Sequence, residues 1–421
     1  MRISSTQIFD IANDSISESN QAIAKTQAQL STGQRVLTPS DDPVASTKIL
    51  EIEQNLAKLD QYGKNIDIAE NNLSQEESTL SSVSNLLQRV REIAVQAGNT
   101  ATYTSSEYAA LASEVDSRID ELMNLLNTRN VGGGYIFAGY TGGDKPFVGD
   151  AQSGFEFTGT DGQVNIKISD STQVATSDSG KAIFVDIPAA QNSFNTSESS
   201  ANTSSPAAQV SVGQVVDQSA YDDFYPEDMI ITFKDDTSVV PVGKNFTITE
   251  RSTGNVIPGF QNMPYVSGQE IQVNGLSFNI TGTPTSGSGA ADGDQFFVES
   301  SPNQDVLTTL ARFSDAMKQV DGTQESKDFV AQIVADTLDN INNAQTSILE
   351  TTAELGARLN TLESTKELHI NTDLVSREIM SELRDLDYAE AASRLASQTL
   401  VLEAAQATFV RVSQLTLFSR L

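Results

Sequence analysis

The chain of 421 residues has no cysteine, no tryptophan and a single histidine, His369. The absence of cysteine excludes disulfide bridges and thiolate chemistry. One histidine without cysteine cannot build the usual zinc sites, so we expect no metal and no cofactor. Because His369 continues an apolar helical series, we expect it to be structural or partly exposed.

Basic residues are scarce as well. The chain has 26 Lys and Arg against 56 Asp and Glu, a net charge of −30, and the acidic excess is densest in residues 141–302. Such a surface repels phosphate, which predicts no nucleic-acid partner. No run approaches the roughly 18 apolar residues of a membrane span, so no membrane is expected either. The N-terminal sequence lacks the apolar core of a cleaved leader, and export by that route is not expected.

Catalytic motifs are missing too. No G-x-S-x-G elbow occurs, and the three Gly-Lys pairs lack the preceding glycine and following Ser or Thr of a phosphate-binding loop. The sequence therefore predicts no catalytic residue and a protein that is not an enzyme. A hydrolase is the least favoured class.

What the sequence does contain is an apolar residue at every seventh position in four stretches, two near each end. The series are Phe9, Ile16, Ile23, Leu30 and Leu37; Ile52, Leu59, Ile66, Leu73, Leu80 and Leu87; Val334, Ile341, Ile348, Leu355 and Leu362; and Tyr388, Leu395, Leu402 and Phe409. This period is typical of helices that wrap around one another. We therefore expect the two ends of the chain to meet in a helical bundle.

The helical pattern covers residues 5–30, 43–97 and 105–127, returns after Pro302, and runs from about 326 almost unbroken to the C-terminus. Gly33 suits a helix C-cap, and Ser40 or Asp41 an N-cap of the following helix.

Between these helices the period changes to the alternation typical of strands. Strands are predicted at 155–157, 164–168, 183–187, 229–233, 246–249 and 296–298, with a hairpin at 271–278 around Asn274-Gly275. Residues 192–205, rich in Ser, Thr and Asn, predict a mobile surface loop, and Pro302 is expected to close this part. The predicted fold class is α+β and multidomain: a long coiled-coil-like bundle of N- and C-terminal helices with an inserted antiparallel β domain.

Three domains follow from this pattern. Residues 1–40 with 380–421 are predicted to form an inner, tube-forming helical domain, 41–140 with 303–379 a helical rod, and 141–302 an outer β-rich domain. The first helical stripe is too thin to bury alone, because Ala12, Ser19 and Thr26 flank it. We therefore expect other copies of the chain to complete it.

Two sets of residues carry this expectation. The predicted assembly interface is Phe9, Ile16, Ile23, Leu30, Leu395, Leu402 and Phe409. The predicted rod packing is Leu59, Ile66, Leu73 and Leu80 against Ile341, Ile348, Leu355 and Leu362.

Several end segments resemble a known family. Residues 30–36 and 39–45 resemble the N-terminal signature of the bacterial flagellins, and 385–391 and 415–421 are similar to the family's C-terminal part. Residues 130–140, with the run Asn-Val-Gly-Gly-Gly-Tyr-Ile-Phe-Ala-Gly-Tyr, resemble one branch of it, the hook-associated proteins at the junction between hook and filament.

The resemblance implies a homo-oligomeric ring of subunits on the extracellular flagellum. It also implies contacts with the first hook-associated junction protein and with flagellin, a cytosolic export chaperone, and secretion through the flagellar type III apparatus. Two alternatives stay open: a filament flagellin and, from another class, a secreted adhesin or carbohydrate-binding module on a helical stalk.

Overall fold

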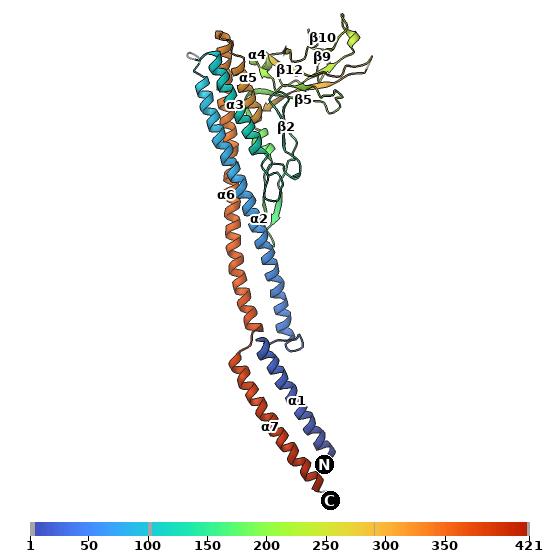
Figure 1. The fold of residues 1–421 in the computed structure, drawn as a ribbon, viewed down its shortest axis with the longest axis vertical. Coiled ribbons are helices and arrows are strands. Elements are labelled where there is room, and N and C mark those ends of the chain that lie inside the picture. Colours follow the sequence, from blue (N-terminus) through green and yellow to red (C-terminus); the bar gives the residue numbers. More distant parts are fainter. Residues whose placement is uncertain (1–4, 100–102, 290, 419–421) are drawn as a thin grey trace. The chain divides into compact units, whose positions relative to one another are not determined.

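The structure, a computed structural model, describes residues 5–99, 103–289 and 291–418 (Figure 1). Helices at both ends and antiparallel strands between them confirm the predicted fold class. The chain divides into two compact units, Met1–Ile66 with Glu363–Leu421, and Asp67–Leu362. The division into three domains stays a prediction.

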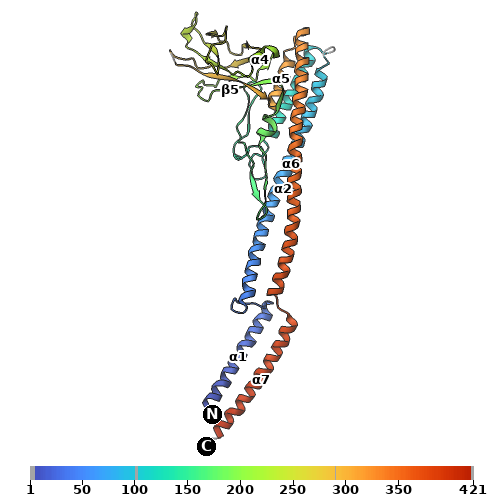
Figure 2. The same ribbon diagram turned by 180° about the vertical axis from the view of Figure 1, so that it is seen from behind.

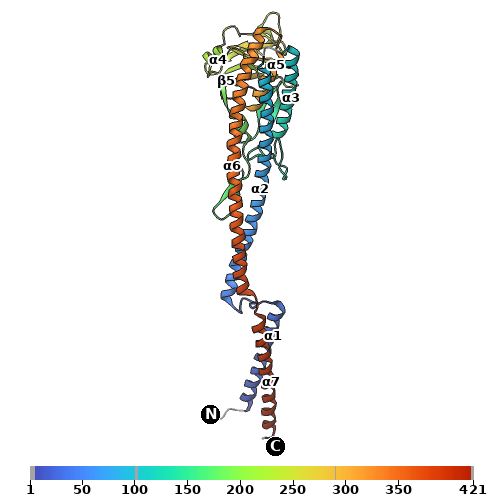
Figure 3. The same ribbon diagram turned by 90° about the vertical axis from the view of Figure 1, so that its left-hand side faces the viewer.

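The first unit contains α1 (Ser5–Thr32) and α7 (Tyr388–Phe418), which lie side by side (Figure 3), together with the beginning of α2 (Pro43–Ala97) and the end of α6 (Gln324–Arg384). Gly33 ends α1 with φ +70°, as its position predicts.

The caps of the neighbouring helices differ from the prediction. The carboxylate of Asp42, rather than Ser40 or Asp41, caps α2 by accepting the Ala45 N–H at 3.0 Å. The C-terminal helical pattern is also interrupted: α6 ends at Arg384, and the carboxylate of Asp387 caps α7 by accepting the N–H groups of the second and third residues after it. A side chain that competes for backbone N–H groups favours such a break.

The helical part of the second unit combines α2 from Asp67 and α6 up to Leu362 with α3 (Ser105–Leu126) and α5 (Val306–Lys318) (Figure 2). Thr104 and Glu107 form a capping box at the start of α3. The Ser314 hydroxyl of α5 donates to Asp116 of α3 at 2.6 Å, and the predicted break between α5 and α6 is confirmed.

The β-rich part has two main antiparallel sheets whose inner faces share one apolar core with α4 (Gln218–Phe224). The five-stranded sheet has the order β10 (Met263–Pro264), β9 (Asn245–Glu250), β8 (Met229–Phe233), β13 (Gln295–Asn303), β5 (Pro188–Glu198). The other contains β11 (Glu270–Val273), β12 (Leu276–Thr281), β6 (Gln209–Val210) and β7 (Gln214–Val215). Two smaller pairs are β1 (Phe147–Asp150) with β2 (Gly154–Phe157), and β3 (Asn165–Lys167) with β4 (Gln173–Ala175).

The hairpin prediction is confirmed, since Asn274 and Gly275 both have positive φ, +47° and +79°. The strand predicted at 183–187 is wrong: η1 (Lys181–Val185) is a π-helical turn, closed by the Asp186 N–H on the Lys181 carbonyl at 2.9 Å. A short apolar run does not by its period alone distinguish strand from helix.

The mobile loop predicted at 192–205 is also wrong over its first half. Residues 188–198 form β5, which pairs with β13 and buries Phe194 completely. Pro302 lies inside β13 rather than after the domain, at a shift in pairing register between Ser301 and Asn303. Proline is tolerated there because a bulge leaves one backbone N–H unpaired.

Candidate assembly surface

The helices α1 and α7 are held together by few buried side chains. The rings of Phe9 and Phe409 lie 4.9 Å apart. Farther along, the Thr26 hydroxyl donates to Gln398 at 2.9 Å, and the Arg394 guanidinium donates to Gln29 at 3.2 Å. Among the side chains of α1 that the structure describes, the buried ones are thus the polar Thr26 and Gln29 rather than apolar ones.

The structure brings the predicted interface residues of α1 and α7 to one helix pair but buries none of them. Phe9 is 50% exposed. The others are half-buried: Ile16, Ile23, Leu30, Leu395, Leu402 and Phe409. An apolar stripe that the pair covers only partly is available to further helices. Its use in assembly stays a prediction.

The segments that carry the family resemblance meet beside this pair. Gln34 forms a β-bridge with Asp385, the Arg35 N–H donates to the Arg384 carbonyl at 2.7 Å, and the Leu386 N–H donates to the Gly33 carbonyl at 3.0 Å. We name this contact of residues 33–35 with 384–386 the clasp. It joins N- and C-terminal segments more than 340 residues apart in sequence.

An ion pair fixes the loop next to the clasp. Lys25 binds Asp41 at 2.6 Å, and the Asp41 carboxylate also accepts the N–H groups of Leu37 and Thr38. The hydrogen bond from Lys25 is the main reason that the pKa of Asp41 falls to about 2. The contribution of Asp41 to stability is therefore present above pH 4 and is lost as the pH falls toward 2.

Replacing Gly33 is expected to weaken the clasp. A Cβ at Gly33, whose φ is +70°, would lie 2.8 Å from the Tyr388 hydroxyl, so Gly33→Ala should cost about 1–2 kcal/mol. Hydrogen exchange at the Leu386 amide should accelerate accordingly. The control is Gly63→Ala, where a Cβ meets nothing within 4 Å inside α2 and should stabilise by about 0.5–1 kcal/mol. Equal effects of the two substitutions would contradict this explanation.

The first unit buries little apolar surface of its own. Among its described residues, the buried apolar side chains are Ala45, Ile66, Leu386 and Ala391. The second unit, in contrast, buries apolar side chains on every long helix and on both main sheets. A folded unit with so small a core exposes apolar area that a partner can cover.

Five of the exposed apolar residues of the first unit lie on two flanks of α6. Leu368, Val375 and Ile379 follow one another at spacings of seven and four and form flank A; Ile370 and Leu374, four apart, form flank B. Leu368, Ile370 and Leu374 are each more than 60% exposed. At 3.6 residues per turn the two flanks are roughly 140° apart. His369 lies on the other, wider side of α6 between them, and its ring is 5.8 Å from that of Tyr62.

His369 is half-buried, and partial burial lowers its pKa. Its ring contact with Tyr62 of α2 lies within the first unit and gives it a packing role. Over residues 5–99, 103–289 and 291–418, no three acidic or histidine side chains gather into a metal-binding group. Of the helices that the structure describes, none is both long and apolar enough to cross a bilayer.

The predicted rod-packing residues lie deeper. Seven of the eight are buried, and Leu59 is half-buried; the buried ones are Ile66, Leu73, Leu80, Ile341, Ile348, Leu355 and Leu362. Within the second unit, α2 and α6 are joined by a hydrogen bond of 2.6 Å from the Arg91 guanidinium to Asn342.

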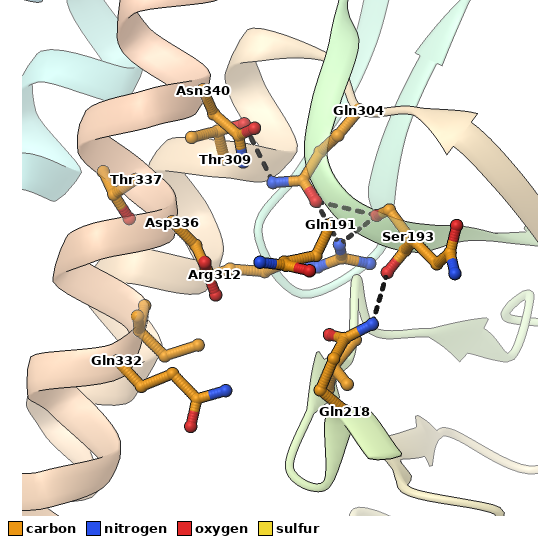
Figure 4. A pocket seen from close by; sticks show the side chains of 13 residues that line it. Gln191, Ser193, Gln218, Gln304, Thr309, Arg312, Gln332, Asp336, Thr337 and Asn340 are labelled. Carbon is orange, nitrogen blue, oxygen red and sulfur yellow. Dashed lines mark hydrogen bonds between the residues drawn. The ribbon is translucent and has the colours of Figure 1, made fainter. Parts of the chain in front are cut away.

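A buried polar network in the second unit was not predicted from the sequence. Arg312 of α5 is 6% exposed and stacks 4.3 Å from the ring of Phe194. Its guanidinium donates to three backbone carbonyls, Gly213, Phe194 and Val212, and to the side chains of Ser193 and Gln304. Figure 4 shows Arg312, Gln304 and Ser193 converging beside a cavity of about 40 Å³, with Asp336 on the adjoining helix.

The network anchors α5 to strand β5. Burial lowers the pKa of Arg312 to about 10, against the attraction of Asp305 and Tyr221, so the side chain stays charged at neutral pH. A cavity of this size holds a few water molecules. The only sequence signal was an arginine within the apolar pattern of residues 306–317.

Comparison with known proteins agrees with this arrangement. Residues 3–141 match the family model of the bacterial flagellin N-terminal helical region. Beyond this, the chain is similar to flagellar hook-associated protein 3. The protein of that name from Salmonella typhimurium strain LT2 is 38% identical over 147 residues, 35% of this chain and 46% of that protein.

A solved structure extends the likeness to most of the fold. The crystal structure of flagellar hook-associated protein 3 from Legionella pneumophila has a TM-score of 0.52 and 26% identity, and covers 80% of this chain and 98% of that one. Flagellin from Escherichia coli strain K12 is 29% identical over 120 residues, 28% of this chain and 24% of that protein. The chain spans about half the length of the hook-associated relatives that it matches in sequence.

Proposed function

We propose that this protein is a structural subunit of the bacterial flagellum that forms the junction between hook and filament. In this role copies of the chain form a ring, contact the first hook-associated junction protein on one side and flagellin on the other, and allow flagellin to polymerise. Export unfolded through the flagellar type III apparatus, with a cytosolic chaperone, completes the proposal. It involves no catalysis and places the protein outside the cell.

The observation that carries this proposal is the pair of apolar flanks on α6. One exposed patch suffices for a two-fold dimer, in which both partners use the same surface. Two unlike flanks on either side of a helix instead allow one copy to contact the next head to tail, and such contacts generate rings or tubes. The half-buried stripe of α1 and α7 offers the same opportunity in the same unit.

The alternatives are less well supported. A filament flagellin shares the helical ends, but the similarity to hook-associated protein 3 is closer than that to flagellin, 38% against 29% identity. Copy number separates the two, since a ring holds few subunits and a filament thousands. An adhesin or carbohydrate-binding module would depend on residues 141–302, so a chain lacking them would lose its activity, whereas a junction protein should still support filament assembly.

Electron microscopy of cells that lack the protein tests the proposal. We expect intact hooks, no filaments and flagellin released into the medium, because nothing would receive the first flagellin subunits. Re-expression of the full chain should restore filaments. Filaments of normal length in the deletion strain would refute a junction role.

A further inference from the structure

A glutamate interrupts the buried apolar stripe of α2. Within the second unit, Glu76 lies three residues after Leu73 and four before Leu80, at a position that faces the neighbouring helix. Both leucines are fully buried, and Glu76 is 1% exposed. Neither carboxylate oxygen of Glu76 makes a hydrogen bond of ordinary geometry to a described residue, but the backbone and the carboxylate of Asp178 lie close enough to act on it.

Arg358 interrupts the stripe of α6 in the same way, three residues after Leu355 and four before Leu362. Its guanidinium binds the buried carboxylate of Asp178 through two hydrogen bonds, of 2.8 and 3.1 Å, and also that of Glu354 at 3.1 Å. Asp178 accepts a further hydrogen bond from Gln163.

These groups act on one another electrostatically. Burial is the main cause that raises the pKa of Glu76 to about 9; the charge of Asp178 adds to the rise, and Arg358 opposes it. Glu76 is therefore protonated at neutral pH, and Asp178 is the buried anion that balances Arg358. The charged groups that surround Glu76 are Asp178 before η1 and Arg358 on α6, with the more exposed Glu354 beyond the arginine.

Asp178 lies at one end of a segment, residues 178–190, that packs along the side of α6. Besides the pair with Arg358, Ser347 donates to the carbonyl of Ile183, Asn343 donates to that of Pro188, and Asn340 accepts the N–H of Ala190. The segment 178–190 thus runs antiparallel to α6, and these other contacts are neutral hydrogen bonds. The Asp178–Arg358 pair is its only charged contact with α6 among those that the structure describes.

We propose that Glu76 and Asp178 compete for Arg358, so that docking of segment 178–190 on α6 takes up one proton at Glu76. In the docked state Asp178 neutralises Arg358 and Glu76 stays protonated. When the segment leaves, Arg358 loses its buried anion. Glu76 then releases its proton to solvent and becomes the anion that pairs with Arg358. The three side chains form a proton-linked latch.

The direction of the pH dependence follows from this exchange. A carboxyl group whose pKa is higher in the docked state binds more protons there, so docking is favoured at low pH. Between the pKa of Glu76 in the undocked state and its value of about 9 in the docked state, one proton is released on opening. The opening equilibrium should therefore rise about tenfold per pH unit and become constant above that value.

Hydrogen exchange of the full chain tests the latch. The reporters are two amides of the segment: that of Ala190, which donates to the Asn340 side chain of α6 at 2.7 Å, and that of Gly180, which donates to the Phe137 carbonyl at 2.9 Å. Between pH 6 and pH 8 the protection factors of both should fall about tenfold per pH unit in the wild type. In Glu76→Gln, which keeps the shape but cannot ionise, they should stay constant. Glu77→Gln, at the exposed neighbouring position, is the matched control and should behave as the wild type.

Infrared spectroscopy gives a second readout, which uses the wild-type chain and therefore does not depend on whether a substituted chain folds. At pH 7 the wild type should show the carbonyl stretch of a protonated carboxylic acid, and this band should disappear as the pH passes about 9. Absence of the band at pH 7, or protection factors with the same pH profile in wild type and Glu76→Gln, would overturn the proposal. Neither measurement depends on assembly, so the latch and the junction function can fail separately.

Discussion

A chain with one cysteine on each flank of α6, Ile370→Cys with Ile379→Cys, is expected to cross-link into a ladder of dimers, trimers and higher oligomers on assembled flagella. The natural chain has no cysteine, so a bifunctional thiol reagent reacts only at the introduced sites. If flank A of one copy faces flank B of the next, every subunit joins two neighbours. Each single-cysteine chain should give no oligomer beyond a dimer.

Charge on either flank should abolish the ladder. A glutamate at Leu368 on flank A, or at Leu374 on flank B, would bury an unpaired carboxylate in the contact, costing at least about 3 kcal/mol, roughly a hundredfold in affinity. Because both leucines are exposed in the single chain, its helical content and melting temperature should stay unchanged.

The matched control is Asn371→Glu, an exposed polar position on the side of α6 opposite to His369, in the sector between the two flanks but on neither of them. It should leave the ladder and the filaments intact. A double-cysteine chain that stops at dimers would show a two-fold contact instead of a head-to-tail one. Leu368→Glu and Leu374→Glu chains that still build filaments would show that the flanks are not used.

The helices were predicted well because their information is local. The helical pattern placed α2 and α3 within one residue of their observed ends, and the seven-residue series marked positions of α2 and α6 that are buried, such as Leu73 and Leu355. A stripe of that period can face only one side of a helix. The sequence also carried a signal for the clasp, because the two segments that form it overlap those that show the family resemblance.

The errors lie where the decisive partner is distant in sequence. Strand β5 has the composition of a loop, yet its backbone pairs with β13, more than 90 residues away. This pairing satisfies backbone N–H and C=O groups that would bind water in a loop. Residues 183–187 alternate like a strand, but Ile183 and Phe184 are both buried, and Phe184 packs edge-on against Phe137 at 5.1 Å. Tertiary packing overrides a short local pattern.

The two buried charge clusters show a different limit. Glu76 and Arg358 both occupy positions in the apolar stripes of their helices where a buried side chain is expected, so the spacing alone could have predicted that they are buried. The sequence could not show that Asp178, from an inserted segment, completes the pair. Arg312 is harder still, because its partners are mostly backbone carbonyls, which carry no side-chain signature.

Arg312→Met is expected to destabilise the second unit by about 3–5 kcal/mol. The substitution keeps much of the side-chain volume, but the acceptors Gly213, Phe194 and Gln304 lose their donor inside the protein. Leaving buried polar groups unsatisfied costs far more than the net value of the hydrogen bonds themselves. Denaturant unfolding followed by near-ultraviolet circular dichroism measures this loss, because Tyr221 lies in the same core and tryptophan is absent.

Two further variants separate the role of the guanidinium from that of its charge. Arg312→Lys keeps the charge but concentrates three donors at one point, so it cannot reach acceptors spread over Ser193, Phe194 and Gly213, and it should lose most of the stability as well. Arg251→Met, on the exposed ion pair with Glu299 in the same β-rich part, should change the free energy of unfolding by less than about 1 kcal/mol. If Arg312→Met were as mild as Arg251→Met, the network would be dispensable and apolar packing alone would hold α5 against β5. If Arg312→Lys matched the wild type, charge rather than the planar set of donors would be what the core requires.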